Sequence, residues 1–238
     1  MTVACKAGAA TRYGRSGGRI QPLCRFWAAA LMFAFVLGLH AMTTPLQAQT
    51  PPLKLVALGD SLTAGYNLPS SAAFPAVLEN LLREKGISVE IANAGVSGDT
   101  SQGGLERLDW SVPDGTDGVI LELGANDALR GIDPAVAEKA LDAIVTRLKA
   151  RGIPVLLAGM YAPRNLGSDY ATRFDGLYPR IAEKHGLILY PFFLDGIAGD
   201  RVLNQPDLLH PTAEGVRVIA TRILPTVERF LATLRPRS

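Results

Sequence analysis

The stretch LKLVALGDSLT, residues 53–63, decides the fold. It begins with an apolar run at 53–58 that contains the β-branched Val56, and such a run is typical of a buried strand in a parallel sheet. The run stops at GDS, residues 59–61. Open α/β sheets hold their sites just beyond the carboxyl ends of strands, so we expect the Ser61 hydroxyl at a functional edge. A serine needs a base and oxyanion donors before it can act as a nucleophile.

Four more apolar segments follow this strand, and patterns with helical spacing separate them. The expected strands are 87–92, 118–123, 153–160 and 187–190. The expected helices are 74–85, 101–109, 134–151, one that ends near His185, and one after Pro211 in which Pro225 should cause a kink. In the third helix we expect a buried stripe of Val136, Ala140, Leu141, Ile144 and Leu148. This alternation predicts an α/β fold, a three-layer α/β/α sandwich with a five-stranded, mostly parallel sheet.

The first 48 residues differ from the rest of the chain in composition. Their only charged side chains are Lys6, Arg12, Arg15, Arg19 and Arg25, and an apolar run at 26–42 follows. A basic segment, an apolar segment and a small residue at the exit are typical of a secretory signal peptide. We therefore expect a signal peptide at 1–48, cleaved after Ala48, one domain at 49–238, and a periplasmic or secreted protein. The alternative is an uncleaved membrane anchor, because the run is about as long as a bilayer requires.

Removal of this leader changes the charge of the chain. The full sequence has 24 Lys and Arg against 22 Asp and Glu, and loss of the five basic leader residues leaves 19 and a net charge of −3. The mature chain therefore lacks the basic surface of a nucleic-acid-binding protein, and we expect no such partner. Cys5 and Cys24 both lie in the leader, so we expect no disulfide and no cysteine-based metal site in the mature chain. We also expect no stable membrane insertion after cleavage, and we favour a monomer.

The two histidines beyond the leader have different sequence contexts. His185 lies in EKHG, at the expected end of a helix, where a cation complements the helix dipole and a structural role suffices. His210 lies in PDLLHP, at the entrance to the last helix, with Asp207 three residues before it. In a turn, residues i and i+3 lie over one another, so the Asp207 carboxylate could fix the tautomer of a general base. Alone, the pair fits a helix cap and a surface histidine equally well.

Four segments together supply what a serine hydrolase needs. They are GDSLT at 59–63, NAGVSGDT at 93–100, GAND at 124–127 and DLLHP at 207–211. In this order they resemble the four blocks of the GDSL/SGNH hydrolase family. The chain is most similar to the subgroup of bacterial periplasmic arylesterases, acyl-CoA thioesterase I and lysophospholipases. The resemblance covers nearly all residues after the leader and implies the flavodoxin-like fold of SGNH hydrolases.

The resemblance also implies a role for each matching residue. Ser61 would be the nucleophile, His210 the general base, and Asp207 the residue that orients it. The backbone N–H groups of Ser61 and Gly95, with the side-chain amide of Asn126, would form the oxyanion hole. The implied activity is serine esterase chemistry, in which a carboxylic ester is hydrolysed through an acyl-enzyme on Ser61, without a metal or cofactor.

The sequence says less about the substrate than about the type of reaction. The expected wall of the pocket carries Tyr66, Leu129, Arg130, Tyr161 and Leu166, which would form an apolar acyl groove or, equally, serve in ordinary loop packing. We expect small-molecule or lipid esters, namely aryl or short-to-medium acyl esters, with thioesters and lysophospholipids left open. Two alternatives remain: an exported carbohydrate acetylesterase with the same triad, and a non-catalytic lipid- or ligand-binding domain.

Overall fold

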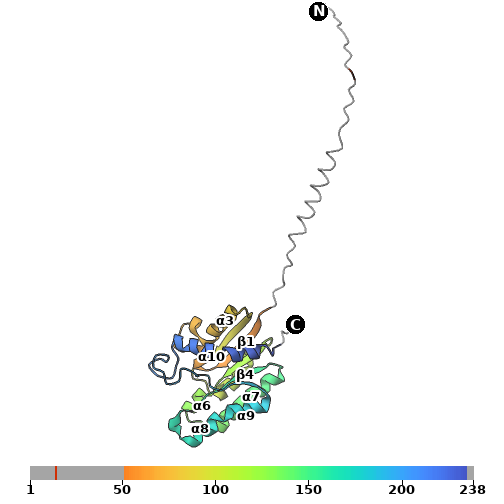
Figure 1. Cartoon of the computed structure of the whole chain (residues 1–238). Coiled ribbons are helices and arrows are strands. Elements are labelled where there is room, and N and C mark those ends of the chain that lie inside the picture. Colours follow the sequence, from red (N-terminus) through yellow and green to blue (C-terminus); the bar gives the residue numbers. More distant parts are fainter. Residues whose placement is uncertain (1–13, 15–50, 235–238) are drawn as a thin grey trace, which may run out of the picture. The chain divides into compact units, whose positions relative to one another are not determined.

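The computed structural model describes residue 14 and residues 51–234, and the latter contain a sheet flanked by helices (Figure 1). The strands are β1 Leu53–Gly59, β2 Val89–Gly95, β3 Gly118–Glu122, β4 Val155–Ala158 and β5 Ile188–Tyr190. Their order is β2-β1-β3-β4-β5, and every neighbouring pair is parallel. The predicted α/β sandwich with five strands is therefore confirmed. Apart from residue 14, the expected signal peptide lies outside the described residues.

Helices cover the sheet and connect its strands. The α-helices are α2 Ser61–Ala64, α3 Phe74–Glu84, α4 Ser101–Glu106, α5 Leu108–Ser111, α6 Ala125–Leu129, α7 Pro134–Ala150, α8 Ser168–Asp175, α9 Leu177–His185 and α10 Ala213–Leu231. Two short 3₁₀ turns are η1 Ser70–Ala72 and η2 Arg164–Leu166. Helices α3 and α10 pack together, and α7 packs against α9 (Figure 1). Helix α4 packs against α7 as well. No helix among the described residues is long and apolar enough to cross a membrane.

The register of the central strands brings three chain segments to one edge. Gly59, the last residue of β1, pairs with Gly95 on β2 and with Glu122 on β3. The loops that follow these three strands therefore begin side by side at the carboxyl edge of the sheet. Gly59 also allows α2 to turn back onto the strand, because a Cβ at this position would lie 2.0 Å from the Thr63 hydroxyl oxygen.

Several expected boundaries differ from those in the structure. Strand β2 runs to Gly95, three residues beyond the predicted end, because it stays paired with β1 as far as Gly59. The helix expected at 101–109 is divided into α4 and α5 at Arg107. The helix that ends at His185 is similarly divided into α8 and α9 at Gly176. The last helix, by contrast, continues through Pro225 as the sequence predicted, and the expected kink stays a prediction.

The buried face of α7 confirms most of the predicted stripe and corrects one position. Ala140, Leu141, Ile144 and Leu148 are buried, as expected. Val136 is 49% exposed, so its prediction is wrong. Ala137 is buried in its place, and the spacing 137, 141, 144, 148 keeps one face of a 3.6-residue helix toward the core.

Candidate active site

The side chains of Ser61, His210 and Asp207 form one hydrogen-bonded chain at the carboxyl edge of the sheet. Nε2 of His210 lies 2.9 Å from Oγ of Ser61, and Nδ1 lies 2.7 Å from Oδ2 of Asp207. A proton on Nδ1, held by the carboxylate, leaves Nε2 as an acceptor for the serine proton. The structure thus brings together the three residues that the sequence predicts as a triad.

Ser61 is held by a tight turn between β1 and α2. It is the first residue of α2, and Oδ1 of Asp60 accepts a hydrogen bond from the backbone N–H of Leu62 as the N-cap of that helix. The turn ends at Gly65, whose φ of 80° belongs to the left-handed region. The Ser61 side chain is therefore fixed by backbone geometry, directly after a buried strand.

The Asp207–His210 turn fixes the imidazole by backbone hydrogen bonds. Oδ1 of Asp207 accepts from the N–H groups of Leu209 and His210, both at 3.0 Å. The hydrogen bond from the His210 backbone, joined by the His210 side chain and the Leu209 N–H, lowers the pKa of Asp207 to about 2. Leu208 inside the turn has a left-handed φ of 59°. Asp207 therefore stays ionised at neutral pH and can stabilise an imidazolium.

Two residues connect this histidine turn to the loop that follows Ser61. The ring of Tyr66 lies over His210 with a centroid distance of 4.4 Å. Nε2 of Gln205 donates to the carbonyl oxygens of Tyr66 and Pro211, both at 2.9 Å, and its backbone N–H donates to the His210 carbonyl. Sequence reasoning placed Tyr66 at the pocket but missed Gln205, which has no motif around it.

Asn126 lies at the start of α6, between the loop that follows β1 and the loop that follows β2. Its Nδ2 donates to Oδ2 of Asp60 at 3.1 Å and to the backbone oxygen of Asp99 at 2.9 Å. Gly124, the N-cap of α6, has a φ of 117°, a conformation that residues with a side chain rarely adopt. Glycine at this position therefore lets the chain enter α6 immediately after β3. The amide is therefore held beside the Ser61 turn by two acceptors from different loops.

Gly95 does not occupy the position that the resemblance implies. As the last residue of β2, it donates its N–H to Oδ1 of Asn93 at 2.9 Å. A Cβ at Gly95 would lie 2.3 Å from the backbone nitrogen of Ala64, so glycine is needed for close packing of β2 against α2. The prediction treated Gly95 as a loop glycine because it ended β2 too early. The structure gives it a packing role.

Gly98, three residues later, has the properties expected of a free backbone donor. It is exposed, its φ is 86°, and within residues 51–234 its N–H has no hydrogen-bond acceptor. Its carbonyl oxygen accepts from Nη2 of Arg130 at 2.6 Å. The next residue, Asp99, is the one whose carbonyl oxygen holds the Asn126 amide. Arg130 therefore supports the loop rather than lining the cavity.

Two carboxyl groups are buried beneath the Ser61 turn. Oε2 of Glu122 accepts from the Thr63 hydroxyl at 2.7 Å and from the Asp60 N–H at 3.4 Å. Burial raises the pKa of Glu122 well above its ordinary value, and burial likewise raises the pKa of Asp60 to about 6. Burial thus favours the protonated form of Glu122, whose Oε2 holds the turn from below. Its only signal in the sequence is its place at the end of an apolar strand.

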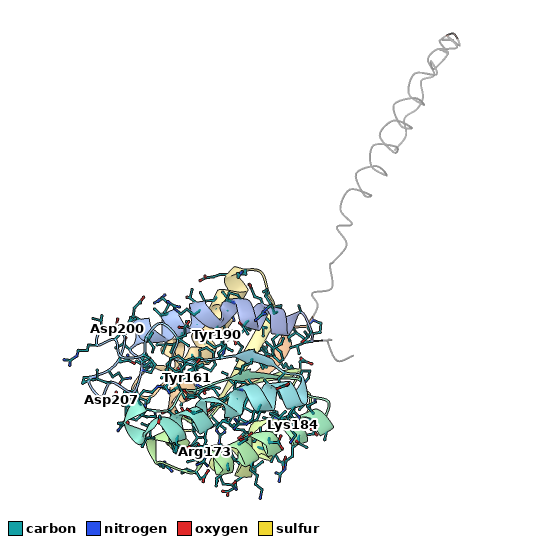
Figure 2. All side chains as sticks on the ribbon, turned by 60° about the horizontal axis from the view of Figure 1, so that its bottom comes forward. Tyr161, Arg173, Lys184, Tyr190, Asp200 and Asp207 are labelled. Atoms are coloured by element: carbon teal, nitrogen blue, oxygen red, sulfur yellow. The ribbon has the colours of Figure 1, made fainter. Side chains whose placement is uncertain are left out.

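A mostly apolar cavity of about 250 Å³ opens beside the catalytic hydroxyl. It is lined by Ser61, Leu62, Ala125, Asn126, Ala128, Leu129, Met160, Tyr161, Pro163, Leu194, Leu209 and His210. Leu129 and Tyr161 were expected there, whereas the other three predicted residues, Tyr66, Arg130 and Leu166, do not line it. Tyr161 and Asp207 lie toward the same end of the sheet, away from Lys184 (Figure 2). Most of the other lining residues become neighbours only through folding, so sequence spacing could not identify them.

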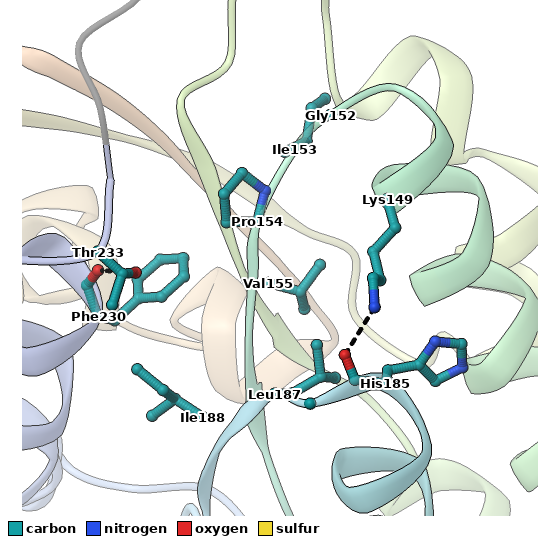
Figure 3. Close-up of a pocket in the computed structure, with 11 residues that line it drawn as sticks. Lys149, Gly152, Ile153, Pro154, Val155, His185, Leu187, Ile188, Phe230 and Thr233 are labelled. Carbon is teal, nitrogen blue, oxygen red and sulfur yellow. Dashed lines mark hydrogen bonds between the residues drawn. The ribbon is translucent and has the colours of Figure 1, made fainter.

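A larger cavity of about 460 Å³ lies at the opposite edge of the sheet, around the residues that precede β4 and β5 (Figure 3). Lys149 donates there to the carbonyl oxygen of His185 at 2.6 Å. Nε2 of His185 lies 2.7 Å from Oδ1 of Asp142, which is consistent with the structural role predicted for this histidine. The Ser61–His210–Asp207 chain lies at the carboxyl edge of the sheet, so this cavity is separate from the candidate active site.

A parallel sheet that carries a serine–histidine–aspartate chain and a nearby amide donor defines the class of serine-dependent acyl hydrolases. Residues 57–218 match the GDSL-like Lipase/Acylhydrolase family, and the chain belongs to this family. It is a carboxylic-ester hydrolase of the SGNH type.

Relatives of known sequence and structure cover most of the chain. Esterase TesA of Pseudomonas aeruginosa is 34% identical over 203 residues, which are 85% of this chain and 99% of that protein. The arylesterase of Vibrio mimicus is 39% identical over 168 residues, or 70% of this chain and 84% of that protein. The crystal structure of AlinE4, an SGNH-hydrolase family esterase, is 45% identical with a TM-score of 0.65, and the match covers 77% of this chain and 99% of that one.

Proposed function

We propose that the protein hydrolyses its ester through an acyl-enzyme on Ser61. Oγ attacks the ester carbonyl while Nε2 of His210 takes the serine proton, and Asp207 stabilises the imidazolium that forms. His210 then returns the proton to the leaving alcohol. Water attacks the acyl-enzyme by the same route and releases the acid. The observation that carries this proposal is the continuous chain from Ser61 to Asp207, with distances of 2.9 and 2.7 Å.

For the developing oxyanion we propose the N–H groups of Ser61 and Gly98, with the Asn126 amide. The Ser61 N–H opens a helix and has no acceptor among the described residues, as is usual for a first-turn donor. The Gly98 N–H likewise has no hydrogen-bond acceptor within residues 51–234, whereas the N–H of Gly95 donates to Oδ1 of Asn93. The Asn126 amide would share its longer hydrogen bond, 3.1 Å to Asp60, with the oxyanion.

The nucleophile assignment is tested by pre-steady-state kinetics with an activated aryl ester. The wild-type enzyme should release a burst of the aryl alcohol equal to the enzyme concentration, and Ser61→Ala should show none. A retained burst would remove Ser61 from the role. A crystal structure of the phosphonylated enzyme tests the donors. It should place a phosphoryl oxygen within hydrogen-bond distance of the Gly98 nitrogen, and a contact with the Gly95 nitrogen instead would contradict the proposal.

We propose aryl esters or esters of short-to-medium apolar acids as substrates. The cavity beside Ser61 is bounded by aliphatic and aromatic side chains such as Met160, Tyr161 and Leu194 and offers few groups that could bind the hydroxyls of a sugar. This favours an acyl esterase over a carbohydrate acetylesterase. Activity measured across oxygen esters of increasing chain length, thioesters, lysophospholipids and acetylated sugars tests the choice. Higher catalytic efficiency on acetylated sugars would reverse it.

We propose that the protein is exported and acts in the periplasm or outside the cell as a monomer. The basic and apolar leader at 1–48 supports export. Sequencing the exported protein should give an amino terminus near Gln49, and an intact Met1 would contradict cleavage. We also propose that it needs no metal or nucleic-acid partner. Activity should then survive a chelator, and light scattering should give the mass of one mature chain.

A further inference from the structure

Arg107 is a buried cation outside the catalytic chain. It lies at the junction of α4 and α5, and only 6% of the residue is exposed. Burial of a guanidinium is unfavourable unless its N–H groups are paired with well-placed acceptors. The acceptors that Arg107 contacts therefore indicate what it contributes to the fold.

The Arg107 guanidinium joins the ends of two neighbouring strands. Nη2 donates to the carbonyl oxygen of Gly59, the last residue of β1, and Nη1 donates to the carbonyl oxygen of Ala94 in β2, both at 2.8 Å. Nη1 also donates to the Ser111 hydroxyl at 3.0 Å. The strand ends that precede Ser61 and the Gly98 loop are thus held by one rigid, planar group.

The Nε group of the guanidinium binds the loop that carries Gly98, one of the three proposed oxyanion donors. Nε donates to Oδ2 of Asp99 in an ion pair that is largely buried. The backbone oxygen of the same Asp99 accepts from the Asn126 amide at 2.9 Å. Gly103 leaves room for this carboxylate, since a Cβ there would lie 2.8 Å from Oδ1 of Asp99. Asp99 is therefore fixed between Arg107 and Asn126.

We propose that Arg107 is a positioning residue that sets the oxyanion donors at the correct distance from Ser61. It acts through the Gly59 carbonyl on the Ser61 turn, and through the Asp99 carboxylate on Asn126 and Gly98. This inference rests on the proposed oxyanion arrangement. Because those donors act mainly on the transition state, misplacing them lowers kcat and leaves KM nearly unchanged. Lysine cannot replace the guanidinium, because a single ammonium group has three donors and cannot reach the four acceptors that Arg107 binds through a rigid plane.

The test compares Arg107→Lys with Arg180→Lys as a matched control. Arg180 also makes a two-pronged contact, to Glu138, but it lies on α9 away from the site. All rates are divided by the concentration of active sites, titrated with a fluorophosphonate, so unfolded enzyme does not contribute. We expect Arg107→Lys to lower kcat by about 10- to 100-fold with KM within about threefold of wild type, and the control to leave both unchanged. An unchanged kcat, or a rise in KM alone, would overturn the proposal.

A second variant keeps the proposal testable if Arg107→Lys does not fold. Asp99→Asn preserves the size of the side chain and removes the charge that Arg107 holds, so it should give the same selective loss of kcat. Normal kcat in Asp99→Asn would overturn the link to the oxyanion donors. A failure of this proposal can be told apart from a failure of the nucleophile assignment. If Ser61 were not the nucleophile, Ser61→Ala would still turn over substrate, whatever the result for Arg107.

Discussion

Replacement of Asp207 by asparagine changes one atom at the far end of the catalytic chain. The new Oδ1 can still accept from the N–H groups of Leu209 and His210, so the turn should keep its shape. The new amide nitrogen, however, would replace the carboxylate oxygen that lies 2.7 Å from Nδ1 of His210. An amide nitrogen can only donate, so it favours the tautomer with Nδ1 unprotonated. Nε2 then carries the proton and cannot accept that of Ser61.

The size of the effect follows from the exposure of the carboxylate. Loss of a buried triad aspartate to asparagine lowers kcat by about 10⁴-fold in the best-studied serine hydrolases. Here the Asp207 side chain is 38% exposed, so solvent weakens its interaction with the imidazolium. We therefore expect kcat to fall by about 10²- to 10³-fold for a p-nitrophenyl ester, with KM nearly unchanged.

The assay is steady-state hydrolysis at neutral pH with Asp200→Asn as control. Asp200 also accepts from two backbone N–H groups, those of Val202 and Leu203, but it does not contact His210. The control should retain wild-type kinetics. If Asp207→Asn kept kcat within about fivefold of wild type, or if the control lost as much activity, our account of the tautomer would be wrong.

Three further predictions concern the oxyanion, the buried acid and the cavity. Asn126→Ala should lower kcat by about 10²-fold, and a loss below tenfold would remove it from the oxyanion hole. Burial raises the pKa of folded Glu122 above the value of about 4.5 in the unfolded chain, so the contribution of Glu122 to stability should decrease as the pH rises above about 4.5. Denaturant unfolding should therefore show Glu122→Gln gaining stability relative to wild type as the pH rises above about 4.5, and a difference that stays constant with pH would contradict a raised pKa of Glu122. Met160→Trp should shorten the longest acyl chain accepted while acetate esters still react, and an unchanged chain-length profile would show that Met160 does not limit the cavity.

Local patterns in the sequence predicted the strands and their common edge, and the resemblance to the GDSL/SGNH family supplied the roles of the triad. This succeeded because a parallel sheet brings every strand end to one side, so residues distant in the chain, such as Ser61 and Asn126, could be placed together from strand order alone. The contact between Asp207 and His210 could be predicted because a single turn brings residues i and i+3 together. These features depend either on hydrophobic periodicity over a few residues or on the rule that parallel strands place their carboxyl ends at the same edge of the sheet.

Features set by register and by distant partners could not be predicted in the same way. The choice between Gly95 and Gly98 depends on how far β2 stays paired with β1, which apolar periodicity does not reveal. Arg107 and Glu122 look like surface charges in the sequence. Their burial follows from carbonyl and hydroxyl partners in other segments, such as Gly59 and Thr63, that become neighbours only in the folded chain.

The central claim is that one hydroxyl, activated by one imidazole, forms the covalent intermediate. Intact-protein and peptide mass spectrometry after reaction with a fluorophosphonate tests it most directly. We expect one adduct per chain, located on Ser61, absent from Ser61→Ala and formed far more slowly by His210→Ala. An adduct on another residue, or labelling of His210→Ala at the wild-type rate, would contradict it.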